Sequence, residues 1–274
     1  LFAAFPFAYA ALMPALYIPI LIMLLALILR GVAFEFRLHG RARGKRFWTA
    51  AFAGGSLTAT LAQGLVLGGF IQGVTLRDRR FAGGPFDWLT PYTLLVAVGL
   101  VAGYALLGAA WLIWRTQDEL HGRARRWAWL SLAAVAILLA AVSLATLYIH
   151  PRVALRWGWE AGHFDLARLT PRLPIPLLGL AGLALAALGL QRKSHGWPFA
   201  GAVLMFLSGY LGLAAGFFPN IVPYAMTFRQ AANPDNTLGL LLVGAAILLP
   251  AIVGYSLWVY WIFRGKVGVG EGYH

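Results

Sequence analysis

The chain consists of long apolar runs that are separated by short clusters of charged residues. Seven stretches carry no charged side chain: 1–29, 47–76, 88–114, 127–149, 173–190, 197–228 and 236–263. A helix rises about 1.5 Å per residue, so about 20 residues cross a hydrocarbon core of about 30 Å. The runs lack the alternation of apolar and polar residues that is typical of an outer-membrane barrel. The pattern therefore predicts an all-α integral membrane protein with about seven transmembrane helices.

The composition agrees with this prediction and excludes other classes. Hydrophobic residues make up 61% of the chain, charged residues make up 11%, and the mean hydropathy is +0.75. A soluble domain carries about 25% charged residues, so a cytosolic enzyme and a disordered tail are excluded. The chain has no Cys, which excludes disulfides, thiolate metal sites and iron–sulfur clusters. The net charge of +13 lies between the apolar runs, as in the loops of a membrane protein, and does not indicate nucleic-acid binding.

The basic residues predict how the chain is oriented in the membrane. When successive loops are assigned to alternate sides, fourteen of the 22 Lys and Arg residues fall on one side and eight on the other. Cytoplasmic loops are typically richer in Lys and Arg. We therefore expect the richer loops, which include 39–46 and 122–126, to be cytoplasmic together with the C-terminus.

Two similar segments indicate an internal repeat. They end the third and the seventh stretch and lie 151 residues apart, which corresponds to four crossings. This spacing predicts a parallel repeat of two four-helix bundles, 1–115 and 116–274, in which the first helix of the first half is absent. Such repeats occur in transporters and do not by themselves select a function. The matching residues are Gly103, Tyr104, Trp111 and Arg115 in the first half, and Gly254, Tyr255, Trp261 and Arg264 in the second.

The beginning of the chain supports a missing helix. The first residue is Leu1 and no charged segment precedes the first apolar run, so a signal peptide does not account for this end. We expect a longer polypeptide upstream. Pro6 and Pro14 interrupt the first run, which places the best crossing at about 13–29.

Among the acidic residues, Glu35 is the strongest functional candidate. An ionisable residue inside a membrane span is costly and is presumed functional, but all nine acids fall in or next to predicted loops. This distribution argues against an ion-coupled transporter. Glu35 lies between Phe34 and Phe36, just after the first run. It is either a carboxylate at the cytoplasmic mouth of a proton path, balanced by Arg30, or a charge at a membrane end that pairs with its neighbours.

The histidines lie in predicted loops or at the terminus, so we do not expect them to ligate haem or a metal. Gly-x-x-x-Gly patterns at 64–68 and 99–103 lie in apolar runs and predict close helix packing rather than nucleotide binding. Several uncharged polar residues should bridge helices through hydrogen bonds, or contact a quinone headgroup. The histidines are His39, His121, His150, His163, His195 and His274, and the uncharged polar residues are Gln63, Gln72, Tyr104, Tyr210, Asn220 and Tyr255.

The run FPFAYAALMPALYIPI at 5–20, followed by LRGVAFEFR at 29–37, strongly resembles subunit II of cytochrome bd-type quinol oxidases, with the cyanide-insensitive branch nearest. Three further stretches, 103–112, 217–223 and 260–267, are similar to the same family. The resemblance implies a two-subunit core in the bacterial cytoplasmic membrane that oxidises quinol and reduces dioxygen to water. It also implies two four-helix bundles.

The resemblance further implies that haems b and d are carried by the homologous subunit I. This chain would be the scaffold beside it, with no catalytic or metal-binding residue of its own. Small single-helix subunits, membrane lipid, quinol and a structural quinone or lipid are implied as further partners, without nucleic acid. Family members carry an N-terminal helix and an acidic Trp-rich motif upstream of the position where this chain starts. Arg30, Glu35 and Arg37 carry over by position, at the cytoplasmic end of a helix that lines a proton path.

The sequence alone leaves two other functions possible. One is a multi-span solute transporter with a parallel internal repeat, and the other is a haem-bearing membrane anchor of a quinol dehydrogenase. A transporter would move a solute without a partner, whereas an oxidase subunit would co-purify with a haem-containing chain.

Overall fold

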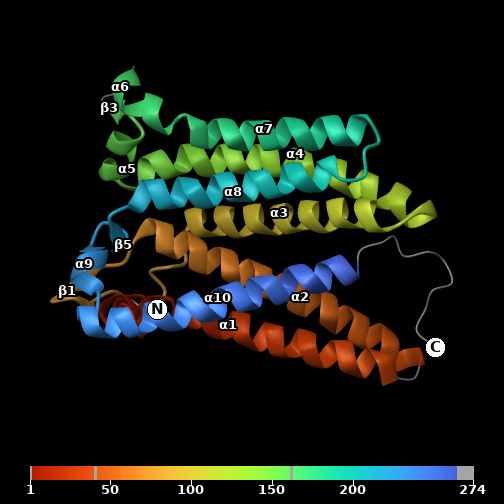
Figure 1. Ribbon diagram of the computed structural model, residues 1–274, viewed down its shortest axis with the longest axis horizontal. Helices are drawn as coiled ribbons and strands as arrows, with labels where there is room; N and C mark the ends of the chain where they lie inside the picture. The colour runs from red at the N-terminus through yellow and green to blue at the C-terminus, as the bar shows by residue number, and fades with distance from the viewer. Residues whose placement is uncertain (1, 40–41, 161–162, 264–274) are drawn as a thin grey trace.

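The protein is described by a computed structural model that covers residues 2–39, 42–160 and 163–263. Seven helices run side by side along the long axis of the molecule (Figure 1), and each is long and apolar enough to cross a membrane. The predicted all-α membrane fold is confirmed. The seven helices are α1 (Pro6–His39), α2 (Ala42–Gln72), α3 (Pro91–Arg115), α4 (Asp118–Ile149), α7 (Pro174–Gln191), α8 (Trp197–Phe217) and α10 (Asp235–Ile262).

Pro6 and Pro14 do not interrupt the first helix as predicted. α1 begins at Pro6 and continues through Pro14 and Pro19 to His39, so the helix extends beyond the crossing predicted at about 13–29. A proline at a helix start replaces an N–H that has no partner there, and prolines inside membrane helices are tolerated when neighbouring segments pack around them. At its C-terminal end, α1 continues beyond the apolar run through charged residues. Polar residues mark where a helix leaves the hydrocarbon core, but they do not end the helix itself.

Other helices also depart from the predicted limits. α4 begins at Asp118, before the apolar run 127–149, so only Thr116 and Gln117 separate it from α3. α8 was expected to extend over 197–228 but ends at Phe217. The start of α3 has a local cause: the Thr90 side chain accepts from the backbone N–H of Thr93, the Thr93 side chain bonds back to the Thr90 N–H, and Pro91 is the first helical residue.

The longer connections gather at one end of the molecule, opposite the short α1–α2, α3–α4 and α7–α8 turns (Figure 1). They contain three two-stranded antiparallel ladders and several short helices. The ladders are β1 (Leu76–Arg77) with β2 (Arg80–Phe81), β3 (Trp159–Glu160) with β4 (His163–Phe164), and β5 (Asn220–Val222) with β6 (Met226–Thr227). The short helices are α5 (Pro151–Arg156), α6 (Leu166–Leu169), the 3₁₀ helix η1 (Thr170–Arg172) and α9 (Phe228–Ala231).

Helices α3, α4, α7 and α8 pack as a four-helix group around one apolar core, which includes Leu106, Ile113, Leu132 and Leu190. Glycines allow the closest approaches between helices. A Cβ at Gly64 would lie 2.3 Å from the Ala97 Cα, so α2 and α3 meet there backbone to backbone. The close packing predicted for 64–68 is confirmed.

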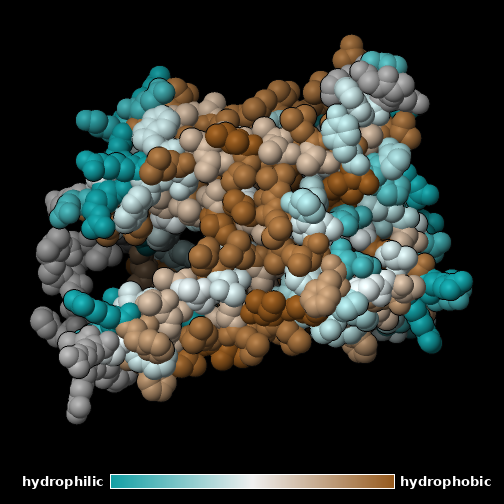
Figure 2. All heavy atoms as spheres, turned by 180° about the vertical axis from the view of Figure 1, so that it is seen from behind, coloured by the Kyte–Doolittle hydropathy of each residue, from teal (hydrophilic) through white to brown (hydrophobic). Residues whose placement is uncertain are grey.

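The outer surface matches a membrane protein. A band of apolar side chains crosses the middle of the molecule, and hydrophilic side chains gather at both ends (Figure 2). No residue of α10 is buried, and Leu240 and Ile247 are 75% and 67% exposed. An apolar surface of this extent is stable only against lipid or against another membrane chain.

Candidate functional site

The three sequence candidates lie in the last turns of α1, but the helix places them on different faces. Arg30, Glu35 and Arg37 are all exposed. At 3.6 residues per turn, Glu35 is rotated about 140° from Arg30 and about 160° from Arg37. The structure therefore brings the two arginines together on one side and Glu35 on the opposite side.

The packing of α1 against α2 shows which of these two faces of α1 contacts the neighbouring helix. A Cβ at Gly55 of α2 would lie 3.0 Å from the Ala26 carbonyl oxygen and 3.3 Å from the Arg30 backbone nitrogen. Ala33, one turn further along α1, is fully buried. Arg30 and Arg37 thus belong to the face that meets α2, and Glu35 belongs to the face that points away from it.

The face that carries Glu35 is apolar along its length. Four exposed residues precede Glu35 on this face at helical spacing, and we call them the outer stripe: Leu21, Leu24, Ile28 and Val32. From Leu21 to Glu35 the stripe extends about 21 Å along the helix. It is an uncovered apolar surface that ends in one carboxylate.

Aromatic residues fix the end of α1 against the start of α2. The ring of Phe36 stacks on Trp48 with centroids 5.0 Å apart, and Phe34 lies 6.4 Å from Phe52. Exposed aromatic rings of this kind collect at the membrane–water boundary. Glu35, between these two phenylalanines, therefore lies near the boundary and not at the centre of the membrane.

The described histidines lie outside the apolar middle of every long helix. His121 and His195 have ring centroids 5.4 Å apart beside the α3–α4 and α7–α8 turns, and His163 is in β4. His150 caps α5, where its Nδ1 accepts from the Arg152 backbone N–H at 3.1 Å. Over residues 2–39, 42–160 and 163–263, no group of three or more His, Cys, Asp or Glu could hold a metal ion. The His39 side chain and His274 lie outside the described residues.

Sequence reasoning missed a cluster around Tyr224, at the opposite end of the molecule. The Tyr224 hydroxyl donates to the Ile71 carbonyl oxygen at 3.0 Å, and its ring stacks on His150 with centroids 4.0 Å apart. Arg152 donates to the Tyr224 carbonyl oxygen at 3.1 Å. A Cβ at Gly73, which has φ of +87°, would lie 2.8 Å from the Tyr224 ring. The cluster ties the end of α2, the start of α5 and the β5–β6 hairpin together.

Burial also changes the acidity of this phenol. Removal from water raises the pKa of Tyr224 to about 12, Tyr92 adds to the rise, and the positive charge of Arg156 opposes it. The hydroxyl is therefore protonated at neutral pH and acts as a donor. Because its partners come from segments about 75 and 150 residues away, only the short stretch 217–223, already similar to a known family, marked this region in the sequence.

Among the uncharged polar residues, two pairs bridge helices as expected. Tyr104 of α3 donates to the Gln63 side chain of α2 at 3.1 Å. Thr90, at the start of α3, donates to the Gln72 side chain at the end of α2 at 2.8 Å. The remaining candidates differ: Tyr210 and Tyr255 are 73% and 64% exposed on the outer surface, and Asn220 begins β5.

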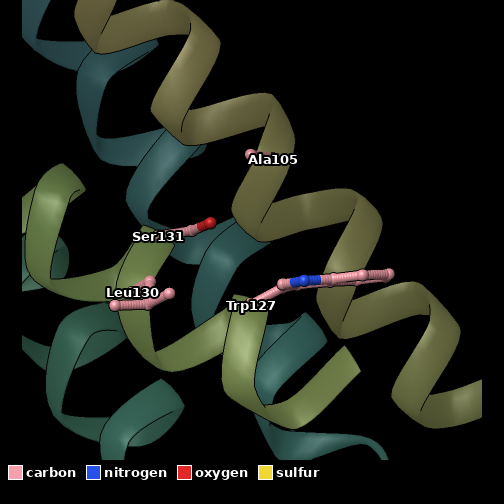
Figure 3. A pocket seen from close by; sticks show the side chains of 5 residues that line it. Ala105, Trp127, Leu130 and Ser131 are labelled. Carbon is pink, nitrogen blue, oxygen red and sulfur yellow. The ribbon is translucent and has the colours of Figure 1, made fainter. Parts of the chain in front are cut away.

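A hollow of about 420 Å³ opens between α3 and α4. Figure 3 shows Trp127, Leu130 and Ser131 on α4 and Ala105 on α3, and Ala109 completes the lining. Apart from the Ser131 hydroxyl and the indole N–H of Trp127, this lining is hydrocarbon. The hollow offers no acid, base or metal ligand, and its chemistry suits an alkyl chain.

Comparison with known proteins decides the family. The family model described as cytochrome bd terminal oxidase subunit II matches residues 1–263. This chain belongs to that family. The resemblance drawn from the sequence is thereby confirmed at the level of the family, and nothing in the comparisons supports the transporter.

Named relatives and one solved structure agree. The subunit II chain is 28% identical to cytochrome bd ubiquinol oxidase subunit 2 of Bacillus subtilis, over 99% of this chain and 79% of that protein. It is 26% identical to cytochrome bd-I ubiquinol oxidase subunit 2 of Escherichia coli K12, over 97% and 78%. The bd oxidase from Geobacillus thermodenitrificans matches with a TM-score of 0.65 and 16% identity, over 90% of this chain and 74% of that one, so the fold is shared.

Proposed function

We propose that this chain is the haem-free subunit of a complex that oxidises quinol and reduces dioxygen to water, and that it acts beside a haem-bearing subunit I. The observation that carries the proposal is the family match over residues 1–263. The relatives in Bacillus subtilis and Escherichia coli are named as subunit 2 of ubiquinol oxidases. The chain is thus a subunit of an oxidoreductase.

The donor groups of this chain support a location of haems b and d in subunit I. Bound there, the haems would carry electrons from quinol to dioxygen. An axial haem ligand is typically an imidazole, thioether or thiolate at membrane depth. The chain has no Cys, and the described histidines lie at helix ends or in connections. These histidines do not fit haem ligation, and the methionines inside the long helices have no imidazole or thiolate partner at that depth among the described residues.

The uncovered surfaces support the scaffold role. The outer stripe of α1 and the whole of α10 present leucine, isoleucine and valine side chains outward. We assign the outer stripe to subunit I, because it is a continuous exposed apolar surface that a second membrane chain could cover. Lipid, quinol and small single-helix subunits would cover the remaining apolar surface.

Glu35 is our candidate for the mouth of a proton path at this interface. Its position at the end of the outer stripe places the carboxylate where a second chain would pack. Arg30 and Arg37 lie on the α2 side of the helix, so we assign them a role through their positive field rather than through contact with Glu35.

The distribution of basic residues supports one orientation in the membrane. The α1–α2, α3–α4 and α7–α8 turns share one end of the molecule, and this end carries most of the basic residues. We propose that this end is cytoplasmic, because cytoplasmic loops are rich in Lys and Arg. Arg115 donates to the Phe263 carbonyl oxygen at 2.7 Å and so joins the last turns of α3 and α10. The halves 1–115 and 116–274 stay a proposal from the repeat in the sequence, since the four-helix group of α3, α4, α7 and α8 takes helices from both.

The test is an assembly experiment. Subunit I is expressed with and without this chain, and quinol-dependent oxygen uptake is measured in the membranes. The proposal predicts oxygen uptake only when both chains are present, with subunit I retained on an affinity tag attached to this chain. Full oxygen uptake by subunit I alone would contradict it.

A further inference from the structure

A second hollow lies at the end of the molecule where α4 begins and α7 ends. Its volume is about 480 Å³. We call it the basic hollow, because cationic side chains dominate its lining and none of its lining residues is acidic. The lining residues are His121, Gly122, Arg125, Arg126 and Trp129 of α4, and Lys193 after α7.

Arg125 is held in place but incompletely bonded. One guanidinium nitrogen, Nη2, donates to the Leu190 carbonyl oxygen in the last turn of α7. The other, Nη1, is buried and has no hydrogen-bond partner in the described part of the chain. A buried cationic donor without an acceptor is costly, and an anion in the adjoining hollow removes that cost.

The other lining cations extend the same chemistry. Arg126 and Lys193 are exposed side chains from two different segments, one on α4 and one in the α7–α8 turn. Guanidinium and ammonium groups that converge in this way match the tetrahedral oxygens of a phosphate group. His121, whose ring lies beside His195, completes the rim.

The surroundings place the basic hollow at headgroup depth. Tryptophans ring the same helix ends, where such side chains mark the boundary between hydrocarbon and water. One of them, Trp129, lines the hollow itself. Beyond this boundary α4 carries apolar residues toward the membrane centre, so a ligand here could combine a phosphate with alkyl chains. The tryptophans are Trp111, Trp114, Trp127, Trp129 and Trp197.

We propose that the basic hollow binds the phosphate of an anionic phospholipid. Arg125 Nη1, Arg126 and Lys193 donate to the phosphate oxygens, Trp129 packs beside the glycerol backbone, and the acyl chains run along α4. A basic pocket between helix ends on the predicted cytoplasmic side is a typical form of anionic-lipid recognition. The proposal does not depend on the oxidase function.

The test uses the purified protein in the complex that it forms. The double variant Arg126→Gln with Lys193→Gln removes two phosphate donors and keeps the Arg125–Leu190 bond that holds α4 to α7. Arg123→Gln is the matched control, because Arg123 belongs to the same helix but does not line the hollow, and its guanidinium lies over the Trp127 ring at 5.3 Å. Co-purified phosphatidylglycerol per copy is measured by mass spectrometry. The melting temperature is measured with added phosphatidylglycerol, phosphatidylcholine or inorganic phosphate.

We expect the double variant to retain about one phosphatidylglycerol fewer per copy than the wild type and to lose the rise in melting temperature that this lipid causes. Arg123→Gln should behave as the wild type, and phosphatidylcholine should have no effect on either. Equal lipid retention by the double variant would overturn the proposal. An equal rise with inorganic phosphate would overturn it as well, because it would show a site for free phosphate.

Discussion

At the scale of single residues, the face of α1 on which Glu35 lies decides what it can do. It ends the outer stripe, away from α2 and from the two arginines. We predict that Glu35→Gln lowers quinol-dependent oxygen uptake and the linked proton uptake by about 100-fold, the lower end of the effect expected for loss of a proton-transferring group. The haem spectrum of the complex should not change, since we assign the haems to subunit I.

Glu119→Gln is the matched control, because Glu119 lies in the first turn of α4 at the same end of the molecule but away from α1. It should leave both rates at the wild-type level. Oxygen electrode and proton-uptake measurements on vesicles give the two rates. Wild-type proton uptake in Glu35→Gln would exclude Glu35 as the mouth of the path.

Tyr224 gives a prediction about stability and pH. Its folded pKa of about 12 is above the usual value of 10.0, so the folded state holds the phenol proton more tightly than the unfolded state does. The resulting stabilisation is complete below pH 10 and is lost as the pH rises toward 12. Tyr224→Phe should remove this part of the pH dependence and, below pH 10, cost about 1 kcal/mol through loss of the bond to the Ile71 carbonyl.

The measurement is the midpoint of unfolding between pH 8 and pH 12 for wild type, Tyr224→Phe and Tyr210→Phe. Tyr210 is 73% exposed on α8 and serves as the control tyrosine. The difference between wild type and Tyr224→Phe should shrink above pH 10. A difference that stays constant up to pH 12 would contradict the assignment.

At the scale of elements, the α7–α8 pair depends on the absence of a side chain at Gly201. A Cβ there would lie 2.5 Å from both the Ala186 nitrogen and the Gly182 carbonyl oxygen. These are backbone atoms that cannot rotate away. We predict that Gly201→Ala destabilises the protein by about 1–3 kcal/mol, the usual cost of overpacking.

Gly209→Ala, in the same helix, is the control, because nothing lies within 4 Å of a Cβ at that position. It should be neutral or stabilising by up to about 1 kcal/mol, since Ala favours a helix more than Gly does. Thermal unfolding in detergent compares the two. Equal melting temperatures for the two variants would show that the helices do not meet at Gly201.

The sequence predicted the number of long helices better than their ends. Apolar length reports the thickness of the membrane, and so all seven helices were found. Helix ends depend on backbone hydrogen bonds and caps, which is why α1 extends from Pro6 to His39 and α8 stops at Phe217. The start of α3 differs from these helix ends, because its cap is formed by neighbouring residues. Thr90 followed by Pro91 is a local signal that can be recognised in a sequence.

In the candidate site, too, features that depend on neighbouring residues could be predicted from the sequence, whereas features that depend on residues distant in the sequence could not. Glu35 was found because a lone carboxylate beside a span is visible in the sequence, and helical spacing alone separates it from Arg30. The Tyr224 cluster was not found, nor was the buried Nη1 of Arg125, which has no partner among the described residues. Each depends on a partner more than 60 residues away, such as Leu190 for Arg125, and no local pattern reports such a contact.

At the scale of the whole molecule, the surface is that of one subunit of a larger membrane complex. The apolar band in Figure 2 and the unburied α10 require lipid or another chain, while the described polar residues hold helices and connections together. In this account the chain supplies packing surface, a candidate proton entry and a lipid site, and subunit I supplies the redox centres.

The most direct test of this account is the haem content of the chain with and without subunit I. Both preparations are purified through a tag on this chain, and visible absorption and extractable haem are measured per copy. We predict a colourless chain when it is expressed alone, and the haem bands of a bd-type oxidase when subunit I co-purifies. Stoichiometric haem bound to the chain alone would contradict the account.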